Sequence, residues 1–269
     1  MSLSADLIIG LRIAFRARFL AVSLWLLLVT LSAAWLAALF SARQPATVAL
    51  DVGLSAIRIA VPLMVVLLVQ ELLCREFERK IFLNSITYPR PRHHFLLGRV
   101  IAILVLLLAL LAVLATAVVA LVAWIASGYH QAMHPALDGR LLLVLSFVAL
   151  DFLIVLAIGT LLGVLARTSS FVLLGTLGLM LVARSYSSIV ELLTRDNTLV
   201  GDADIYQSSL SLLGYLIPDL AALDVRMVSL YGQVQFLPDD WPLRVISTLA
   251  YAAALFALAV WTLNRKKFA

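Results

Sequence analysis

Long uninterrupted apolar blocks dominate this sequence and decide the solvent in which it folds. A helical block of about 20 apolar residues matches the ~30 Å hydrocarbon thickness of a bilayer. Hydrophobic residues make up 64% of the 269 residues and charged residues only 13%, more apolar surface than a soluble domain of this length buries. Residues 1–269 are therefore predicted to form a single transmembrane domain.

Six of these blocks are predicted to cross the membrane, which makes the fold an all-α membrane protein. Their apolar residues run continuously, whereas the strands of a membrane β-barrel alternate in short segments. The first block is too long for the apolar region of a signal peptide, and no clean cleavage pattern follows it. The third exceeds one crossing, so it is expected to tilt or project. The predicted spans are 19–40, 52–73, 96–126, 141–166, 171–190 and 243–263.

The basic residues predict an orientation with both termini in the cytoplasm. Short loops on the cytoplasmic side of membrane proteins are enriched in Lys and Arg. With the N-terminus inside, the short outer loops keep little more than Arg43 and Arg140. The formal charge of +5 then follows from topology and does not indicate nucleic-acid binding. We expect a multi-pass protein of a bacterial cytoplasmic (inner) membrane. The basic residues placed inside are Arg12, Arg16, Arg18, Arg75, Arg79, Lys80, Arg90, Arg92, Arg99, Arg167, Arg265, Lys266 and Lys267.

Residues 1–18 are predicted to form an interfacial helix on the inner leaflet. An apolar face faces lipid while Arg12 and Arg16 lie at its edge. The alternative is a cationic start to the first span. The residues of the apolar face are Leu3, Leu7, Leu11, Ala14 and Phe15.

Residues 71–92 form the most charged stretch and are predicted to continue the second span as a cytoplasmic helix. Glu71 with Arg75 and Glu76 with Lys80 are i, i+4 pairs in the favourable order, and Pro89 ends the helix. A charged helix held between two spans can transmit the movement of a soluble partner to both of them. The alternative is a solvated loop whose charge only sets the topology.

Two stretches together resemble the ABC transporter type-2 permeases, which occur mostly in exporters. The stretch GYLIPDLAALDVR at 214–226 precedes the last span, as a similar stretch does in several members of that family. Lys80 and Ile81 replace a Gly-Thr that is common there. The matching residues between the second and third spans are Glu76, Glu78, Arg79, Lys80, Leu83, Pro89 and Arg92, followed by Leu97, Gly98 and Arg99 at the start of the third span.

The resemblance implies a permease subunit in which residues 71–92 couple to a separate cytosolic ABC ATPase. The sequence has no G-x-x-x-x-G-K-[ST] loop to cradle phosphates, so ATP and Mg²⁺ would be bound by the partner and no cofactor by this chain. Two permease copies, forming a homodimer, and two ATPases would move as rigid bodies around a central path. No catalytic motif such as a nucleophile elbow or H-E-x-x-H is present, so we expect no enzyme activity of its own.

Residues 185–242 are predicted to lie outside the cell. Parity of the spans places them there, and eight acidic residues oppose only Arg195 and Arg226. The segment is too long for a simple connection. It is expected to act as an outer gate or as a docking surface for an envelope protein, or alternatively as a structural lid. The acidic residues are Glu191, Asp196, Asp202, Asp204, Asp219, Asp224, Asp239 and Asp240.

Ionisable residues within the spans are the remaining site candidates. Asp151 lies near the middle of the fourth span, where an unpaired charge is costly. Arg58 and Arg184 lie nearer the outer ends of their spans and can reach toward it. Asp151 either lines the transport path or pairs with an arginine to order the bundle.

Other functional classes stay open at this level. One is an ion-coupled secondary transporter or channel with Asp151 as the ion site, although no internal repeat is visible. Another is a membrane assembly subunit without transport. His130 and His134 have helical i, i+4 spacing, but Pro135 follows and no third ligand is evident, so no metal site is predicted. The spans fit a lipid cargo, a hydrophobic small molecule or a mechanical relay equally well.

Overall fold

The computed structural model describes residues 3–78, 92–128, 135–166, 168–195 and 218–265. This part of the chain is almost entirely helical and contains no strands. Six of its helices are long and apolar enough to cross a membrane, which confirms the predicted all-α membrane fold and the number of spans. These helices are α2 (Phe19–Phe40), α3 (Pro45–Val69), α6 (Arg92–Gly128), α7 (Gly139–Leu165), α8 (Ser169–Arg195) and α11 (Trp241–Arg265).

The helix bounds follow local signals in the sequence. Helix α2 begins and ends where predicted, whereas α3 begins at Pro45, seven residues before its predicted start, because a proline is well placed in the first turn of a helix. The Asp138 side chain caps α7 by accepting a hydrogen bond from the Arg140 amide at 3.1 Å. At its other end α3 passes into a π-helical turn, η1 (Gln70–Cys74), and then α4 (Arg75–Glu78).

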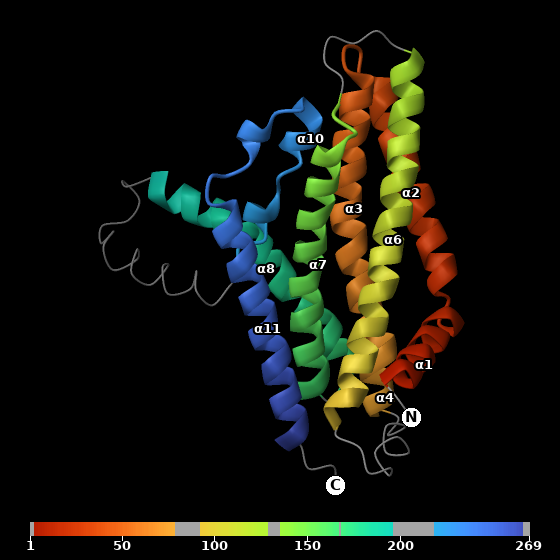
Figure 1. Cartoon of the computed structure of the whole chain (residues 1–269), viewed down its shortest axis with the longest axis vertical. Helices are drawn as coiled ribbons and strands as arrows, with labels where there is room; N and C mark the ends of the chain where they lie inside the picture. The colour runs from red at the N-terminus through yellow and green to blue at the C-terminus, as the bar shows by residue number, and fades with distance from the viewer. Residues whose placement is uncertain (1–2, 79–91, 129–134, 167, 196–217, 266–269) are drawn as a thin grey trace.

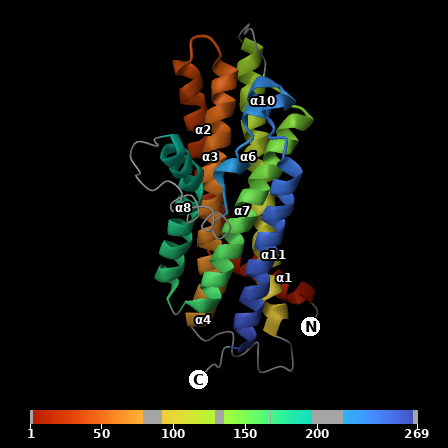
Figure 2. The ribbon, with the colours of Figure 1, turned by 90° about the vertical axis from the view of Figure 1, so that its left-hand side faces the viewer.

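Three helices form the centre of the bundle and three lie at its edge. At least half of the central part of α3, α6 and α7 is buried, against less than a quarter of α2, α8 and α11. Helix α3 contacts α2, α6 and α7, and α11 lies along α7 (Figures 1 and 2). The peripheral helices therefore keep broad apolar faces for lipid or for another protein.

A short helix, α1 (Leu3–Arg16), runs across one end of the bundle, which we call the α1 end (Figure 1). Helix α4 and the last turn of α11 lie at this same end. Two glycines let α1 approach α6 closely. A Cβ at Gly10 would lie 2.8 Å from the Ala102 Cβ, and one at Gly98 would lie 2.7 Å from the Asp6 Cβ.

Near the opposite end of the bundle, the α10 end, residues 218–237, which we call the cap segment, pack against α7, α8 and α3 (Figure 1). Its side chains at Leu220, Leu223, Val225, Val228 and Leu230 are buried. The cap segment therefore belongs to the core of the domain and is not a loose connection. Its helical turns are η2 (Ala221–Leu223), α10 (Met227–Tyr231) and η3 (Val234–Phe236).

Several predicted features lie outside the described residues. Among them are most of the proposed coupling segment, the pair His130 and His134, and residues 196–217 of the acidic stretch. Glu78 ends α4 and Arg92 begins α6, so helix α6 starts at a residue that had been assigned to the coupling segment. The coupling residues outside the described part are Arg79, Lys80, Leu83 and Pro89.

Candidate functional site

The three ionisable residues predicted within the spans do come together. The Arg184 guanidinium on α8 donates from Nη2 to Asp151 Oδ2 on α7 at 2.7 Å. The Asp151 side chain is 1% exposed and that of Arg184 is 21% exposed. A carboxylate this deep in an apolar bundle needs a positive partner, and the geometry supplies it from the neighbouring helix.

A proline explains why Arg58 joins the same site. Pro62 lies inside α3 and has no backbone N–H, so it cannot bond to the carbonyl four residues earlier, which is that of Arg58. The Arg184 Nη2 donates to this carbonyl at 2.7 Å. A backbone acceptor in an apolar environment must be satisfied within the protein. Arg184 thus donates a hydrogen bond to the carbonyl that Pro62 leaves without its helical partner, and it also neutralises Asp151.

The Arg58 side chain continues the contacts toward the α10 end. It forms an ion pair with Asp224 of the cap segment and donates from Nη2 to the Leu220 carbonyl at 3.1 Å. Asp224 also lies 3.3 Å from the Arg226 Nε. The Nη1 of Arg226 is 3.0 Å from Asp51 Oδ1 at the start of α3.

These contacts make one continuous charge network that joins α3, α7 and α8 to the cap segment. It contains three acidic and three basic groups and is therefore neutral. The side chain is 1% exposed at Asp151, at one end of the network, and 31% and 45% exposed at Arg226 and Asp51, at the other end, so the network joins the interior to the surface. The members of the charge network are Asp51, Arg58, Asp151, Arg184, Asp224 and Arg226.

Not every polar atom of the charge network is satisfied. Asp151 Oδ1, Arg58 Nε and Arg184 Nε are buried and have no hydrogen-bond partner among the described residues. Buried polar groups usually have such partners, from the protein or from ordered water. The inner part of the network is therefore suited to hold water or to exchange partners when helices move.

The cap segment is also held by contacts outside the charge network. The Ser229 hydroxyl donates to the Ala136 carbonyl at 2.8 Å, and the Ala136 amide donates to the Ser229 carbonyl at 2.8 Å. The Leu220 amide donates to the Ala183 carbonyl on α8 at 3.3 Å. These bonds, with the buried apolar side chains, hold the cap segment against α8 and the residues that precede α7.

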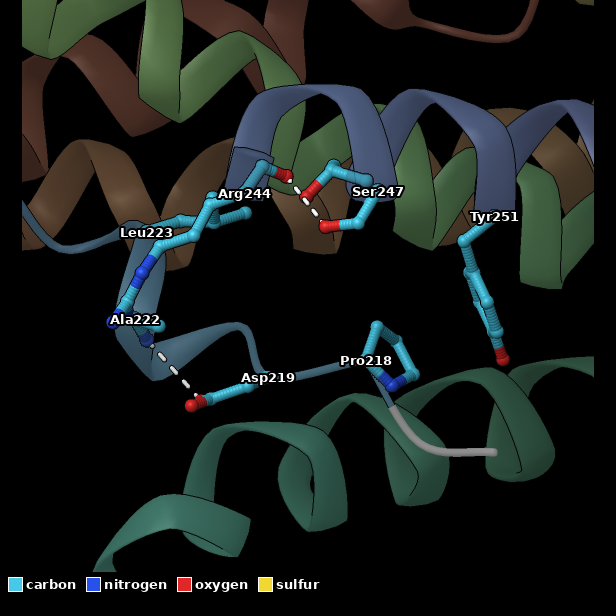
Figure 3. A pocket seen from close by; sticks show the side chains of 8 residues that line it. Pro218, Asp219, Ala222, Leu223, Arg244, Ser247 and Tyr251 are labelled. Carbon is cyan, nitrogen blue, oxygen red and sulfur yellow. Dashed lines mark hydrogen bonds between the residues drawn. The ribbon is translucent and has the colours of Figure 1, made fainter. Parts of the chain in front are cut away.

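A cavity of about 340 Å³ separates part of the cap segment from α11 (Figure 3). Arg244, Ser247 and Tyr251 of α11 face Pro218 and Asp219 across it. Three of its polar residues have partners within the chain. Arg244 Nε lies 2.9 Å from Asp240 Oδ1, the Ser247 hydroxyl donates to the Arg244 carbonyl, and Asp219 Oδ1 accepts from the amides of Ala221 and Ala222. The cavity gives the cap segment space for movement against α11.

A second buried ion pair lies at the α1 end. Arg99 at the start of α6 donates from Nε and Nη2 to the two carboxylate oxygens of Glu76 on α4, with an Nε–Oε2 distance of 3.2 Å. Its Nη1 also donates to the Asp6 carbonyl of α1 at 3.4 Å. Both side chains are less than one-tenth exposed. Arg99 therefore joins α1, α4 and α6.

Burial dominates the electrostatics of Glu76, which lies beyond the second span. Desolvation raises the pKa of its carboxyl above the ordinary 4.5, and the neighbouring Arg99 guanidinium offsets this effect only in part. Glu76 was expected from the sequence to contact a soluble partner. In the structure its carboxylate is buried and paired with Arg99.

Three members of the charge network and Pro62 were not among the site residues singled out from the sequence. Asp51, Ser55 and Arg58 have spacing i, i+4 and i+7, which places a polar stripe on one face of an apolar helix. That pattern, with a proline four residues after Arg58, could have predicted that this face of the helix takes part in a polar site. The pairing of Asp224 and Arg226 with α3 joins residues far apart in sequence and had no such signal.

We compared the chain with known proteins. No family model matches it, and no curated protein sequence matches it.

Proposed function

We propose that this chain is the membrane-spanning permease subunit of an ATP-driven ABC-type exporter. In this proposal the α1 end faces the cytoplasm, α1 lies on the inner leaflet, and residues 71–92 couple the spans to a separate ATPase. The order of sequence motifs that resembles the type-2 permeases supports it, as does the six-span bundle whose helices α1, α4 and α11 share one end.

The observation that carries the proposal is the ion pair between Glu76 and Arg99. The segment between α4 and α6 is covalently joined to both helices, and the ion pair ties its two ends together. A displacement of that segment is therefore transmitted to α3 through α4 and η1, and it is transmitted directly to α6. Glu76 acts in this scheme as a positioning residue that keeps the two helices together, while the residues between them contact the ATPase.

In this proposal the charge network holds the cap segment near the outer end of the spans, and the cap segment moves away during export. This movement requires the pairs of Asp224 and Arg226 with α3 to separate. The Arg226–Asp51 pair is partly exposed, and ion pairs with such access to water contribute only about 0–1 kcal/mol. ATP-driven movement of the spans can therefore break this pair at low cost, and the pair re-forms on return.

The same network weighs against a self-sufficient ion-coupled transporter. Its Asp151 is already neutralised by Arg184 at 2.7 Å. A carboxylate with an arginine partner attracts a coupling cation weakly, because the cation must compete with a fixed positive charge. We therefore assign Asp151 to the ordering of the bundle.

The proposal is tested by placing a photoreactive amino acid at position 83. Leu83 lies in the coupling segment, and the matched control is position 43, in an exposed loop at the α10 end. Irradiation of intact membranes should cross-link position 83, and not position 43, to a protein that contains a G-x-x-x-x-G-K-[ST] loop. Mass spectrometry of the product identifies that partner.

Orientation is tested separately with Leu83→Cys in a Cys74→Ala background. A membrane-impermeant maleimide should label this cysteine only after the cells are permeabilised, whereas Arg43→Cys should be labelled in intact cells. Labelling of position 83 in intact cells, or cross-linking to no ATPase, contradicts the proposed function.

A further inference from the structure

An apolar groove lies on the surface of the bundle near the α1 end. It has a volume of about 340 Å³ and is formed by the bend between α1 and α2 together with one face of α6. Phe15 and Phe19 lie at the bend, and Leu106 and Val113 mark its extent along α6. Seven residues of helix span about 10 Å. The groove is therefore long, narrow and apolar, and its volume lies within the usual range for ligand sites.

The bend beside the groove carries a cluster of positive charge. Arg12, Arg16 and Arg18 are exposed, and no acidic side chain among the described residues pairs with them. Arg18 makes the bend itself with a left-handed backbone, φ 63°, which is uncommon for a residue other than glycine. The groove thus has an apolar interior and an adjacent basic surface.

A hydroxyl group lies between these two parts. Ser23 lines the groove, and its Oγ is buried without a hydrogen-bond partner among the described residues. It is five residues after Arg18, about 7 Å farther along α2. A ligand that satisfies this donor must carry an acceptor between a charged group and an apolar tail.

We propose that this groove binds an anionic phospholipid. One acyl chain lies between α2 and α6, the Ser23 hydroxyl donates to an ester carbonyl, and the phosphate lies against Arg16 and Arg18. A second copy of the chain fits less well, because the helices that form the groove offer Asp6 as their only acidic residue, and Asp6 is buried. This inference rests on the membrane fold and not on coupling to an ATPase.

The test is lipid titration of the purified full chain in detergent, with bound lipids counted by native mass spectrometry. Phosphatidylglycerol and phosphatidylcholine with the same acyl chains are compared. Each basic residue near a membrane surface favours anionic lipid, so we expect phosphatidylglycerol to occupy the site at about tenfold lower concentration. The combined Arg16→Gln and Arg18→Gln variant should lose this preference, whereas Arg43→Gln should keep it.

The acyl-chain part is tested by filling the groove. Ala109 and Ala112 are both exposed on α6, but only Ala109 lines the groove. Ala109→Trp should abolish the high-affinity lipid, and Ala112→Trp should retain it. Ser23→Leu is a second groove-filling variant with the same expected loss, and size-exclusion profiles verify that each variant is folded.

Four outcomes overturn the inference. They are equal binding of the two lipids, equal effects of the two tryptophan variants, full competition by soluble glycerol phosphate, and a dimer that Ala109→Trp dissociates without any change in bound lipid. None of these results bears on cross-linking at position 83, so the proposed function stands or fails separately.

Discussion

The two ends of the bundle hold their charges in opposite ways. At the α1 end, Glu76 and Arg99 form a bidentate pair with both side chains less than one-tenth exposed. The charge network instead runs from Asp151, which is 1% exposed in the interior, toward the α10 end, where the side chains of Arg226 and Asp51 are 31% and 45% exposed. A buried pair is costly to separate because each charge then lacks both its partner and water. Partly exposed pairs exchange readily with water.

The difference indicates which end stays rigid. A compact pair keeps α1, α4 and α6 together through a movement, whereas an extended network can lose contacts one at a time. This is the behaviour expected of a transporter that receives force at one end and opens at the other. Substitutions at the two ends should therefore differ in their effect on unfolding.

The Glu76→Leu variant should lose the most stability, about 3–5 kcal/mol. It leaves Arg99, which is 5% exposed, as a buried charge without its carboxylate. The measurement is thermal unfolding in detergent, followed by reaction of the buried Cys74 with a thiol-specific dye. The control is Glu71→Leu, which removes an exposed i, i+4 pair with Arg75 and should cost at most about 0.5 kcal/mol. Equal effects of the two changes would show that the buried pair is not a rigid joint.

A second variant, Glu76→Leu with Arg99→Met, should recover most of the loss, because it removes both charges. The pH dependence of the unfolding free energy should also differ between the double variant and the unmodified chain. Since burial raises the pKa of Glu76 above 4.5, its contribution to stability is complete below that pH and declines as pH rises through the folded-state value. As the pH rises above about 4.5, the double variant should therefore gain stability relative to the unmodified chain.

The Asp151→Asn variant should lose less, about 2 kcal/mol. Asparagine still accepts a hydrogen bond from Arg184, and Arg184 has some access to water. The same unfolding assay measures the loss, and adding Arg184→Met to the Asp151→Asn variant should restore part of it. Unchanged stability, combined with lost transport in vesicles, would instead place Asp151 in the transport path.

The Gly98→Ala variant tests the close contact of α1 with α6. The new Cβ would lie 2.7 Å from the Asp6 Cβ, and such overpacking costs about 1–3 kcal/mol. Gly178→Ala is the matched control, because a Cβ there meets no atom within 4 Å. It should leave stability unchanged or raise it by up to about 1 kcal/mol through helix propensity. A loss in the control as large as in Gly98→Ala would contradict the assignment.

The Arg226→Gln variant should have the smallest effect on unfolding, at most about 1 kcal/mol, and one that high salt reduces. Its visible consequence is local. Val225 is 2% exposed, and a Val225→Cys probe in the Cys74→Ala background should react with an impermeant maleimide several-fold faster once Arg226 is changed. Arg43→Gln at the same end is the control. An unchanged labelling rate would mean that the apolar contacts alone hold the cap segment.

The sequence by itself determined that the chain folds in a membrane, that its fold is helical, and how many helices are long enough to span the bilayer. Continuous apolar blocks of bilayer length leave the backbone no alternative to the helix, because every N–H and C=O must be satisfied within the segment. The same reasoning identified Asp151, Arg58 and Arg184, since ionisable residues are rare inside a span. Pairing of Asp151 with an arginine was one of the two predicted alternatives, and the structure shows such a pair with Arg184.

Only the tertiary structure decided how these groups are paired. Helical spacing predicted Lys80, one turn along, as the partner of Glu76, whereas the structure pairs Glu76 with Arg99, 23 residues away. Arg58 pairs with Asp224, and its carbonyl, left without the Pro62 amide, accepts from Arg184. Helical periodicity reports only which side chains share a face of one helix. Which faces meet depends on how the whole bundle packs, and that is set by contacts between residues distant in sequence.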